Sequence, residues 1–311
     1  FIFLSTSRVY PIGGLAAVRY NERATRFELA GRQRSPGVSS DGISEAFPLA
    51  GARTIYGTTK LAAELLVAEY AAGFGLPTVI NRCGVIAGPW QMGKIDQGVF
   101  TYWLLAHQLG LPLRYLGFAG SGKQVRDVLH VDDLVELLDD QLARPEVWTG
   151  ATVNVGGGRE RSLSLQETTE LCRELTGNDV KVESAAGEPR PGDVPIYISD
   201  CTGLEAFSDW RPQRSVHQTL SDTSTWLLDH EAEQQISEVR IVKPFARFEH
   251  RLRSIAERDH FGWRKCEVGF LYPGLGSIPE AVEIHMVDKP GRMVEQHPHL
   301  ELPVVRQGRK F

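Results

Sequence analysis

Residues 56–70 read YGTTKLAAELLVAEY, with apolar residues at spacings of three and four. This periodicity predicts an amphipathic helix with a filled apolar face. The face consists of Leu61, Leu65 and Ala68, with Ala62 and Leu66 beside them. Tyr56 and Lys60 then lie one turn apart, and an ammonium group near a phenol stabilises the phenolate. The pair is therefore a candidate proton-transfer unit, although Tyr-x-x-x-Lys also occurs by chance as a packed ring beside a solvated amine.

A short apolar run at residues 1–4 is followed directly by hydroxyl side chains. It predicts a buried parallel strand, and ligands of open α/β sheets bind at the carboxyl ends of such strands. Thr6 and Ser7 are therefore candidate site residues. A hydroxyl there can hydrogen-bond a substrate alcohol while Tyr56 removes its proton, which makes Thr6, Tyr56 and Lys60 a candidate catalytic triad. The alternative for the hydroxyls is a cap that ends the strand.

Four segments occur in the order and spacing of the extended short-chain dehydrogenase/reductases that modify nucleotide sugars. They are Ser5 to Tyr10, Tyr56-x-x-x-Lys60, Arg82 to Pro89, and Arg126 to Asp132. Within that family, the loop from Gly88 to Gly98 resembles the CDP-paratose 2-epimerases, also called CDP-tyvelose epimerases. The resemblance covers residues 1 to about 230.

The resemblance implies an α/β fold, namely the C-terminal part of a Rossmann-type doubly wound parallel sheet plus a small α+β substrate-binding region. We expect this domain at residues 1–231 and leave residues 232–311 unassigned. The resemblance also implies an enzyme with NAD as cofactor and a nucleotide-diphosphate sugar, suspected to be a CDP-sugar, as substrate. Tyr56 and Lys60 would contact both the reacting sugar and NAD.

Arg126 is a candidate ligand for the substrate diphosphate, because a planar guanidinium suits bidentate capture of phosphate. We expect it on a hairpin in which residues 113–116 pair with residues 124–129 through a glycine-rich turn. The alternative role is a structural salt bridge to Asp127 or Asp132.

Three further residues are expected to bind substrate. Ser7 is expected to bind substrate because it follows the carboxyl end of the predicted strand, and the resemblance matches Arg190 to a second diphosphate-binding arginine. Gln97, near the start of a predicted helix, could present its amide to the nucleotide base, as Trp103 could present its ring. The alternative for this helix is core packing.

The fingerprint for dinucleotide binding, a glycine-rich turn after a first strand with an acidic residue further on, does not occur in the sequence. The run at residues 156–158 is a glycine-rich connection instead. Members of the resembled family carry a longer part before the hydroxyl-bearing strand, which holds the adenosine half of NAD. We therefore expect an N-terminally truncated copy that is inactive as a fragment.

The composition describes a soluble globular chain, with 311 residues, 42% hydrophobic and 23% charged. The net charge of -5 favours neither nucleic acid nor an anionic membrane as partner. No apolar stretch approaches the roughly twenty residues of a membrane span, and no leader precedes residue 1, so we expect a cytoplasmic protein. Four scattered cysteines predict neither zinc nor disulfides, and we expect no metal at the loose group of His285, His297, His299 and Glu301.

Two functions remain open. The first is epimerisation of the sugar by transient oxidation and return of hydride to the opposite face. A dehydratase or reductase would use the same residues, but dehydratase relatives add an Asp-Glu pair where this chain has Ser7 and Arg8. The second is a non-catalytic remnant that binds sugar nucleotides or a protein partner, and a homo-oligomer stays possible.

Overall fold

The computed structural model describes residues 1–91, 98–185 and 192–230, so the predicted segment 232–311 lies outside the described residues. The helices are α1 (Ile12–Ala16), α2 (Ile55–Phe74), α3 (Val99–Gln108), α4 (Val131–Ala143), α5 (Pro145–Trp148), α6 (Leu165–Thr176) and α7 (Val216–Asp229). The strands are β1 (Ile2–Thr6), β2 (Tyr20–Glu22), β3 (Phe27–Leu29), β4 (Val79–Cys83), β5 (Val85–Ala87), β6 (Leu113–Leu116), β7 (Val125–His130), β8 (Ala151–Val155), β9 (Ser162–Ser164), β10 (Val182–Ala185) and β11 (Ile196–Tyr197). None of these helices meets the length and apolarity that a membrane crossing requires.

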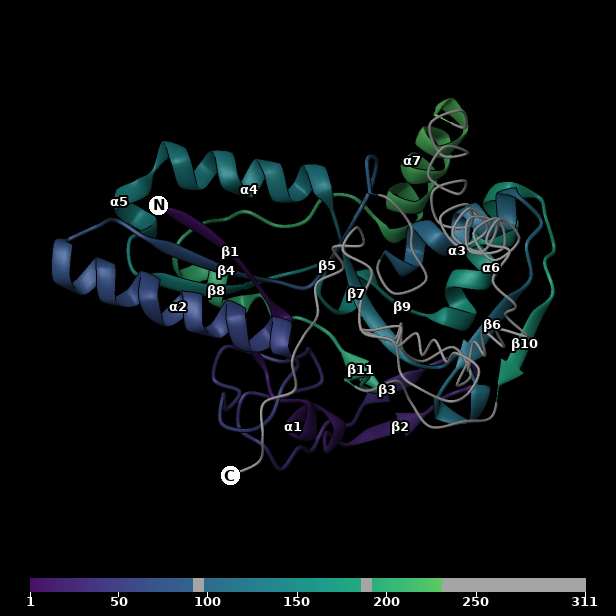
Figure 1. The fold of residues 1–311 in the computed structure, drawn as a ribbon, viewed down its shortest axis with the longest axis horizontal. Coiled ribbons are helices and arrows are strands. Elements are labelled where there is room, and N and C mark those ends of the chain that lie inside the picture. Colours follow the sequence, from purple (N-terminus) through teal and green to yellow (C-terminus); the bar gives the residue numbers. More distant parts are fainter. Residues whose placement is uncertain (92–97, 186–191, 231–311) are drawn as a thin grey trace, which may run out of the picture. The chain divides into compact units, whose positions relative to one another are not determined.

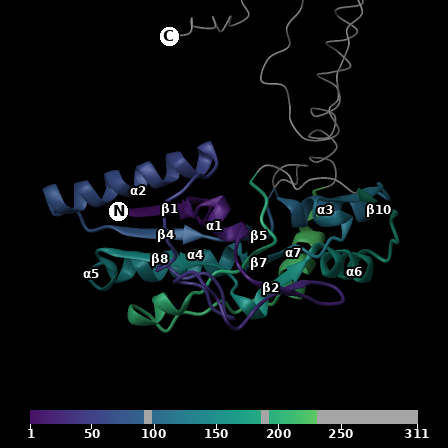
Figure 2. The same cartoon turned by 90° about the horizontal axis from the view of Figure 1, so that it is seen from below.

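The first sheet is parallel, with strand order β1-β4-β8. Helix α2 covers one face of this sheet and α4 the other, as Figures 1 and 2 show. All five residues of β4 are buried, which is typical of a central strand covered on both faces. This arrangement confirms the predicted Rossmann-like α/β fold, and it places the carboxyl end of β1 beside the start of α2.

The second part of the molecule is built around β7, which pairs in parallel with β5 and β11 and antiparallel with β9. Strands β6 and β10 form a separate parallel pair. Helices α3, α6 and α7 gather beside that pair (Figure 1) and share an apolar cluster that includes Trp103, Leu104 and Leu220. This mixture of helices and short strands corresponds to the predicted α+β region.

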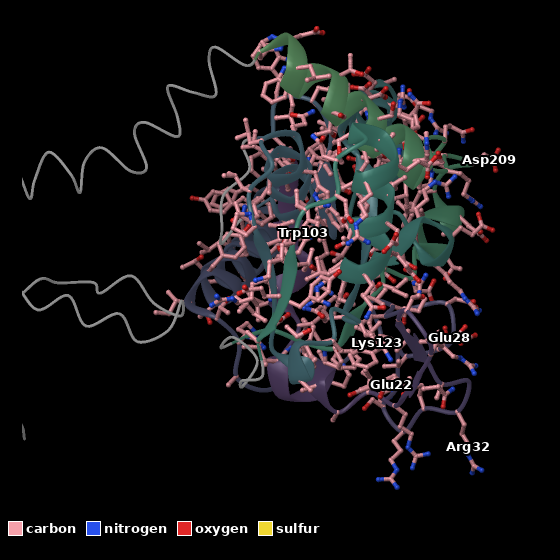
Figure 3. All side chains as sticks on the ribbon, turned by 90° about the vertical axis from the view of Figure 1, so that its right-hand side faces the viewer. Glu22, Glu28, Arg32, Trp103, Lys123 and Asp209 are labelled. Atoms are coloured by element: carbon pink, nitrogen blue, oxygen red, sulfur yellow. The ribbon has the colours of Figure 1, made fainter. Side chains whose placement is uncertain are left out.

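The predicted hairpin between residues 113–116 and 124–129 is wrong. Strand β6 pairs with β10 instead, and β7 finds its partners in β5, β9 and β11. The glycine-rich connection between β6 and β7 packs closely against β10, since an ideal Cβ at Gly120 would lie 2.9 Å from the backbone nitrogen of Ala185. Its end is tied to β2 by an ion pair of 2.7 Å between Lys123 and Glu22 (Figure 3). The backbone hydrogen bonds of β6 and β7 are thus made with strands from distant parts of the sequence, not between the two strands through a local turn.

Most of the predicted apolar face of α2 is exposed, and of its five residues only Leu61 packs against a core cluster. Leu65 and Leu66 are 63% and 61% exposed, whereas Gly57, Glu64 and Val67 are buried. Helix α2 meets β1 and the turn after it through these buried residues, and we call this contact the seam. Gly57 allows the start of the helix to lie very close to that turn.

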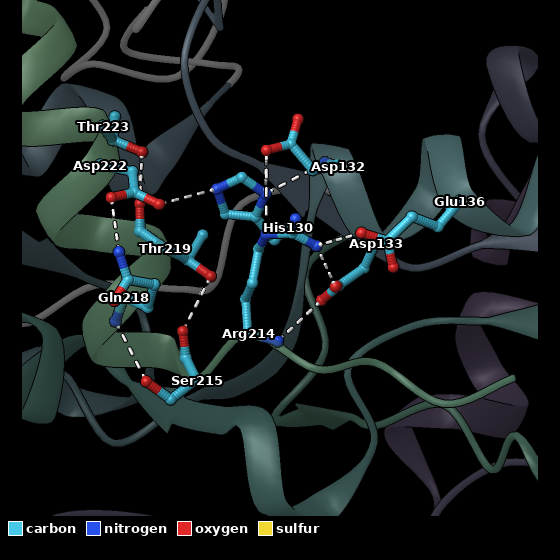
Figure 4. A network of polar contacts seen from close by, with 10 residues as sticks. All are labelled: His130, Asp132, Asp133, Glu136, Arg214, Ser215, Gln218, Thr219, Asp222 and Thr223. Carbon is cyan, nitrogen blue, oxygen red and sulfur yellow. Dashed lines mark hydrogen bonds and ion pairs between the residues drawn. The ribbon is translucent and has the colours of Figure 1, made fainter.

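A polar network joins α4 to α7 where the two parts of the molecule meet (Figure 4). The carboxylate of Asp133 is fully buried and accepts a 2.6 Å hydrogen bond from Arg214 just before α7. His130 accepts a hydrogen bond from the Asp132 backbone through Nδ1 and lies 3.4 Å from Asp222 through Nε2. The network therefore fixes α7 against the helix that covers the first sheet.

We expect the stability of the folded protein to depend on pH through His107 of α3. Its ring is fully buried, and Nδ1 lies 2.7 Å from the backbone oxygen of Trp103, which can only accept a hydrogen bond, so Nδ1 carries the proton. Nε2 is buried and has no hydrogen-bond partner among the described residues. Burial lowers the pKa of His107, and the Trp103 carbonyl opposes this shift only in part. The folded protein therefore holds a neutral imidazole.

A histidine with a lowered folded-state pKa contributes full stability above its unfolded pKa of about 6.5 and loses it as the pH falls. We expect the free energy of unfolding to fall, by at most about 1.4 kcal/mol per pH unit from this group, as the pH drops below about 6.5. Urea unfolding of the wild type and of His107→Gln across this range measures the difference. Parallel pH profiles of the two proteins would contradict the expectation.

Candidate active site

Thr6 lies at the carboxyl end of β1, where the strand passes into the 3-10 turn Ser7–Val9. Its side chain is nearly buried, and its Oγ1 accepts a 3.2 Å hydrogen bond from the backbone of Arg8. Thr6 therefore caps the turn. The cap uses the hydroxyl oxygen as acceptor and leaves its proton free to donate to a ligand oxygen.

Tyr56 is the second residue of α2, and its ring is 54% exposed. Thr54 caps the helix by accepting a hydrogen bond from the backbone of Gly57. At Gly57 the helix approaches the turn after β1 so closely that an ideal Cβ would lie 2.1 Å from the Arg8 carbonyl oxygen. A glycine at this position is thus what brings the start of α2 to the carboxyl end of β1.

Lys60 lies one turn further along α2 and reaches back to β1. Its Nζ donates a 2.8 Å hydrogen bond to the Leu4 carbonyl oxygen, and it lies 5.0 Å from the centroid of the Phe3 ring. No hydrogen bond joins Lys60 to Tyr56 among the described residues. Lys60 is therefore not simply a solvated amine, and two of its three protons remain available to a ligand.

The segment 192–194 contacts residues from distant parts of the chain near the carboxyl end of β1. Arg8 donates a 2.8 Å hydrogen bond to the Gly192 carbonyl oxygen, and an ideal Cβ at Gly192 would lie 3.0 Å from Thr54. Arg126 of β7 donates to the side chain of Asp193 at 2.5 Å and to the backbone of Val194 at 2.8 Å. The segment thus links the ends of β1 and β7 with the start of α2.

The guanidinium of Arg126 forms an ion pair with Asp193. The alternative prediction of a salt bridge was therefore right about the interaction, but neither of its expected partners, Asp127 and Asp132, is the one found. Asp127 lies on the opposite face of β7, as successive residues of a strand do, and is fully buried. Burial lowers the pKa of Arg126, Asp193 opposes that shift, and the nearby positive charge of Arg8 adds to it. Two guanidinium groups and one carboxylate leave a net positive charge, which favours an anionic ligand.

Two of the predicted substrate residues, Gln97 and Arg190, lie outside the described residues. Trp103 belongs to the core, since it is 5% exposed and its Nε1 donates a 3.0 Å hydrogen bond to Thr169. The prediction that its ring meets a nucleotide base is therefore wrong. Ser7 is partly buried, at the start of the turn after β1.

Sequence reasoning missed a buried polar network beneath this site. Glu64 of α2 accepts hydrogen bonds from Ser5 of β1 and from Arg82 of β4, and Arg82 also contacts Tyr10. The signal was Glu64 inside the apolar run Leu61 to Ala68 and Arg82 in the short strand segment that begins Val79-Ile80. Charged residues there indicate a buried pair, because side chains of this kind are almost never fully buried without a partner.

Taken together, the carboxyl end of β1 carries a hydroxyl donor, an exposed phenol, an ammonium group and two guanidinium groups. A model of the NAD dependent epimerase/dehydratase family matches residues 1–156, half of the chain. The chain belongs to this family. The match includes Thr6, Tyr56 and Lys60, and it confirms the resemblance to nucleotide-sugar enzymes.

Two relatives illustrate the range of activities in the family. The CDP-paratose 2-epimerase of Salmonella typhi is 29% identical over 228 residues, which cover 72% of this chain and 64% of the relative. A dTDP-glucose 4,6-dehydratase of Xanthomonas campestris is 28% identical over 183 residues, which cover 57% of this chain and 50% of the relative. The chain thus spans less than two thirds of the length of these relatives.

Solved structures share the fold. The UDP-glucose 4-epimerase of Thermus thermophilus, in complex with NAD, is 23% identical with a TM-score of 0.54, and 73% of this chain matches 63% of that one. The UDP-glucuronic acid 4-epimerase of Bacillus cereus, in complex with UDP-glucuronic acid and NAD, is 21% identical with a TM-score of 0.56, and 74% of this chain matches 61% of that one. The family of this chain is NAD-dependent.

Proposed function

We propose that this chain carries the substrate side of an active site that epimerises a nucleotide-diphosphate sugar, with a CDP-linked sugar as the preferred substrate. The observation that carries the proposal is that Arg8, Thr54 and Arg126 all meet the segment 192–194. This segment thereby links β7 to the turn that follows Thr6 and to the helix start that carries Tyr56. The similarity to CDP-paratose 2-epimerase supports the choice of the CDP-linked sugar.

The sugar end of the substrate would lie at the carboxyl end of β1. There the Thr6 hydroxyl donates a hydrogen bond to a sugar oxygen, and Tyr56 takes the proton of the hydroxyl that is oxidised. Lys60 favours the phenolate through its positive charge. NAD, when bound, supplies a hydride acceptor for the sugar carbon.

The residues present fit the nicotinamide end of NAD. Tyr56 is exposed, and the ammonium group of Lys60 retains two protons for ribose hydroxyls while it holds the Leu4 carbonyl. The diphosphate of the substrate would lie against Arg126 and Arg8. Each guanidinium has N–H groups beyond those that bond the segment 192–194, so both can donate to phosphate oxygens.

For the 311-residue chain by itself, we expect sugar-nucleotide binding that is tighter than NAD binding, and no detectable epimerase turnover. A glycine-rich turn and the helix amino terminus after it normally hold the dinucleotide pyrophosphate, and the sequence contains no such fingerprint. Isothermal titration calorimetry with CDP-glucose and with NAD measures both affinities.

Arg126→Gln should weaken CDP-glucose binding. The control is Arg144→Gln, because Arg144 is the C-cap of α4 and pairs with Asp140 rather than with the segment 192–194. Micromolar NAD binding by the wild type would refute the expected order of affinities. Equal CDP-glucose binding by wild type and Arg126→Gln would remove the support for a diphosphate site at this residue.

A further inference from the structure

Glu64 of α2 makes a buried set of hydrogen bonds to the first sheet. Its side chain accepts hydrogen bonds from the Ser5 hydroxyl at 2.5 Å and from Arg82 Nη2 at 2.7 Å, with Arg82 Nε at 3.1 Å from both carboxylate oxygens. Ser5, Glu64 and Arg82 are between 4% and 6% exposed. We use the name clamp for these three residues.

The clamp continues into the third strand of the sheet. Arg82 lies 5.4 Å from the centroid of the Tyr10 ring, and its Nη1 contacts the Tyr10 hydroxyl at 3.4 Å. That hydroxyl donates a 2.7 Å hydrogen bond to Asn154 of β8. Burial opposes the charge of Arg82, but the hydrogen bonds and charge of Glu64, together with Tyr10, outweigh it and raise the pKa of Arg82.

The clamp lies on the same two elements as the candidate catalytic residues. On α2, Lys60 precedes Glu64 by one turn and Tyr56 precedes it by two. Ser5 is the residue directly before Thr6 on β1. A rotation or slide of α2 that left the clamp would therefore carry Tyr56 away from Thr6.

We propose that the clamp of Ser5, Glu64 and Arg82 is a positioning device, which fixes the rotation and axial position of α2 so that Tyr56 is held beside Thr6. This inference rests on the proposed function, because it assumes that Tyr56 and Thr6 act on one substrate. None of the three clamp residues touches the substrate in this role.

The physical reason lies in the energetics of buried charge. A buried ion pair often stabilises a fold no more than apolar residues of similar volume would, because both charges lose their hydration. Its hydrogen bonds are directional, whereas apolar contacts tolerate sliding. The multiple hydrogen bonds of Glu64 therefore define one position of α2, which a smooth apolar seam of alanine and valine would not.

The test replaces the clamp by apolar side chains in the double variant Glu64→Leu/Arg82→Met, which avoids the unpaired buried charge that either single change would leave. The readout is the NMR signal of a carbon-13 label at Cζ of tyrosine, assigned to Tyr56 by its loss in Tyr56→Phe. We expect Thr6→Val to shift this signal in the wild-type chain, and we expect that response to be lost in the folded double variant.

The matched control lies on the opposite face of the same strand. Asn81 of β4 and Gln141 of α4 exchange two hydrogen bonds, of 2.8 and 2.9 Å, and both are buried. Asn81→Leu/Gln141→Leu removes a buried polar pair that anchors α4 rather than α2. The Tyr56 signal should still respond to Thr6→Val in this control.

The outcomes separate the two proposals. A response in the wild type that survives in the folded clamp variant overturns the positioning role and leaves the proposed function intact. Absence of any response in the wild type overturns both, since Tyr56 and Thr6 then do not share a site. If the double variant does not fold, Ser5→Ala keeps the ion pair and should weaken the response, and an unchanged response in Ser5→Ala overturns the positioning role.

Discussion

Replacing Glu64 with alanine should lower the free energy of unfolding by about 3 to 5 kcal/mol, the usual cost of removing one partner from a buried ion pair. The side chains of Glu64 and Arg82 are 5% and 7% exposed, so water cannot replace the lost carboxylate. The Ser5 hydroxyl would lose its acceptor as well. Chemical denaturation followed by circular dichroism measures the change.

Glu69→Ala is the control for this experiment, because Glu69 lies on the exposed side of the same helix. Surface substitutions of this kind usually change stability by less than about 0.5 kcal/mol. A loss below about 1 kcal/mol for Glu64→Ala would mean that Arg82 finds water or another partner, since unpaired buried charges cost more than that.

Tyr56→Phe should reduce epimerase turnover by about 10² to 10⁴-fold, the usual contribution of a positioned general base. The change removes only the phenolic oxygen, so the dissociation constant of the CDP-sugar should stay nearly the same. The measurement requires a longer form that contains this chain and turns over, supplied with NAD and a CDP-linked sugar.

Tyr70→Phe provides the comparison, since Tyr70 is a second exposed tyrosine of α2. It should leave both turnover and binding as they are. If Tyr56→Phe kept turnover within a factor of about ten of the wild type, general base catalysis by Tyr56 would be ruled out, because such catalysis contributes at least about 10²-fold.

Local patterns predicted several elements of the fold. The apolar run before Thr6 predicted β1, and the periodicity after Tyr56 predicted α2, although the helix begins at Ile55 and extends to Phe74. These predictions succeeded because a strand or helix is favoured by the residues within it. The same reasoning placed Thr6 at the end of a parallel strand, where ligands of such sheets bind.

Long-range pairing was not predictable in this way. The expected hairpin of residues 113–116 with 124–129 is replaced by the pairing of β6 with β10 and of β7 with β11. A glycine-rich segment accepts a tight turn or an open connection equally well. The choice depends on which strands are available from elsewhere in the chain.

The sequence by itself determined the parallel α/β class and the family motifs, and it singled out Thr6, Tyr56 and Lys60 as candidates, because each depends on residue types at short spacings. Only the tertiary structure decided that Leu65 and Leu66 face outward while Glu64 faces inward. Periodicity identifies an apolar stripe but not the surface that the helix meets. Here that surface carries Ser5 and Arg82, and their hydrogen bonds to the Glu64 carboxylate decide which side of α2 is buried.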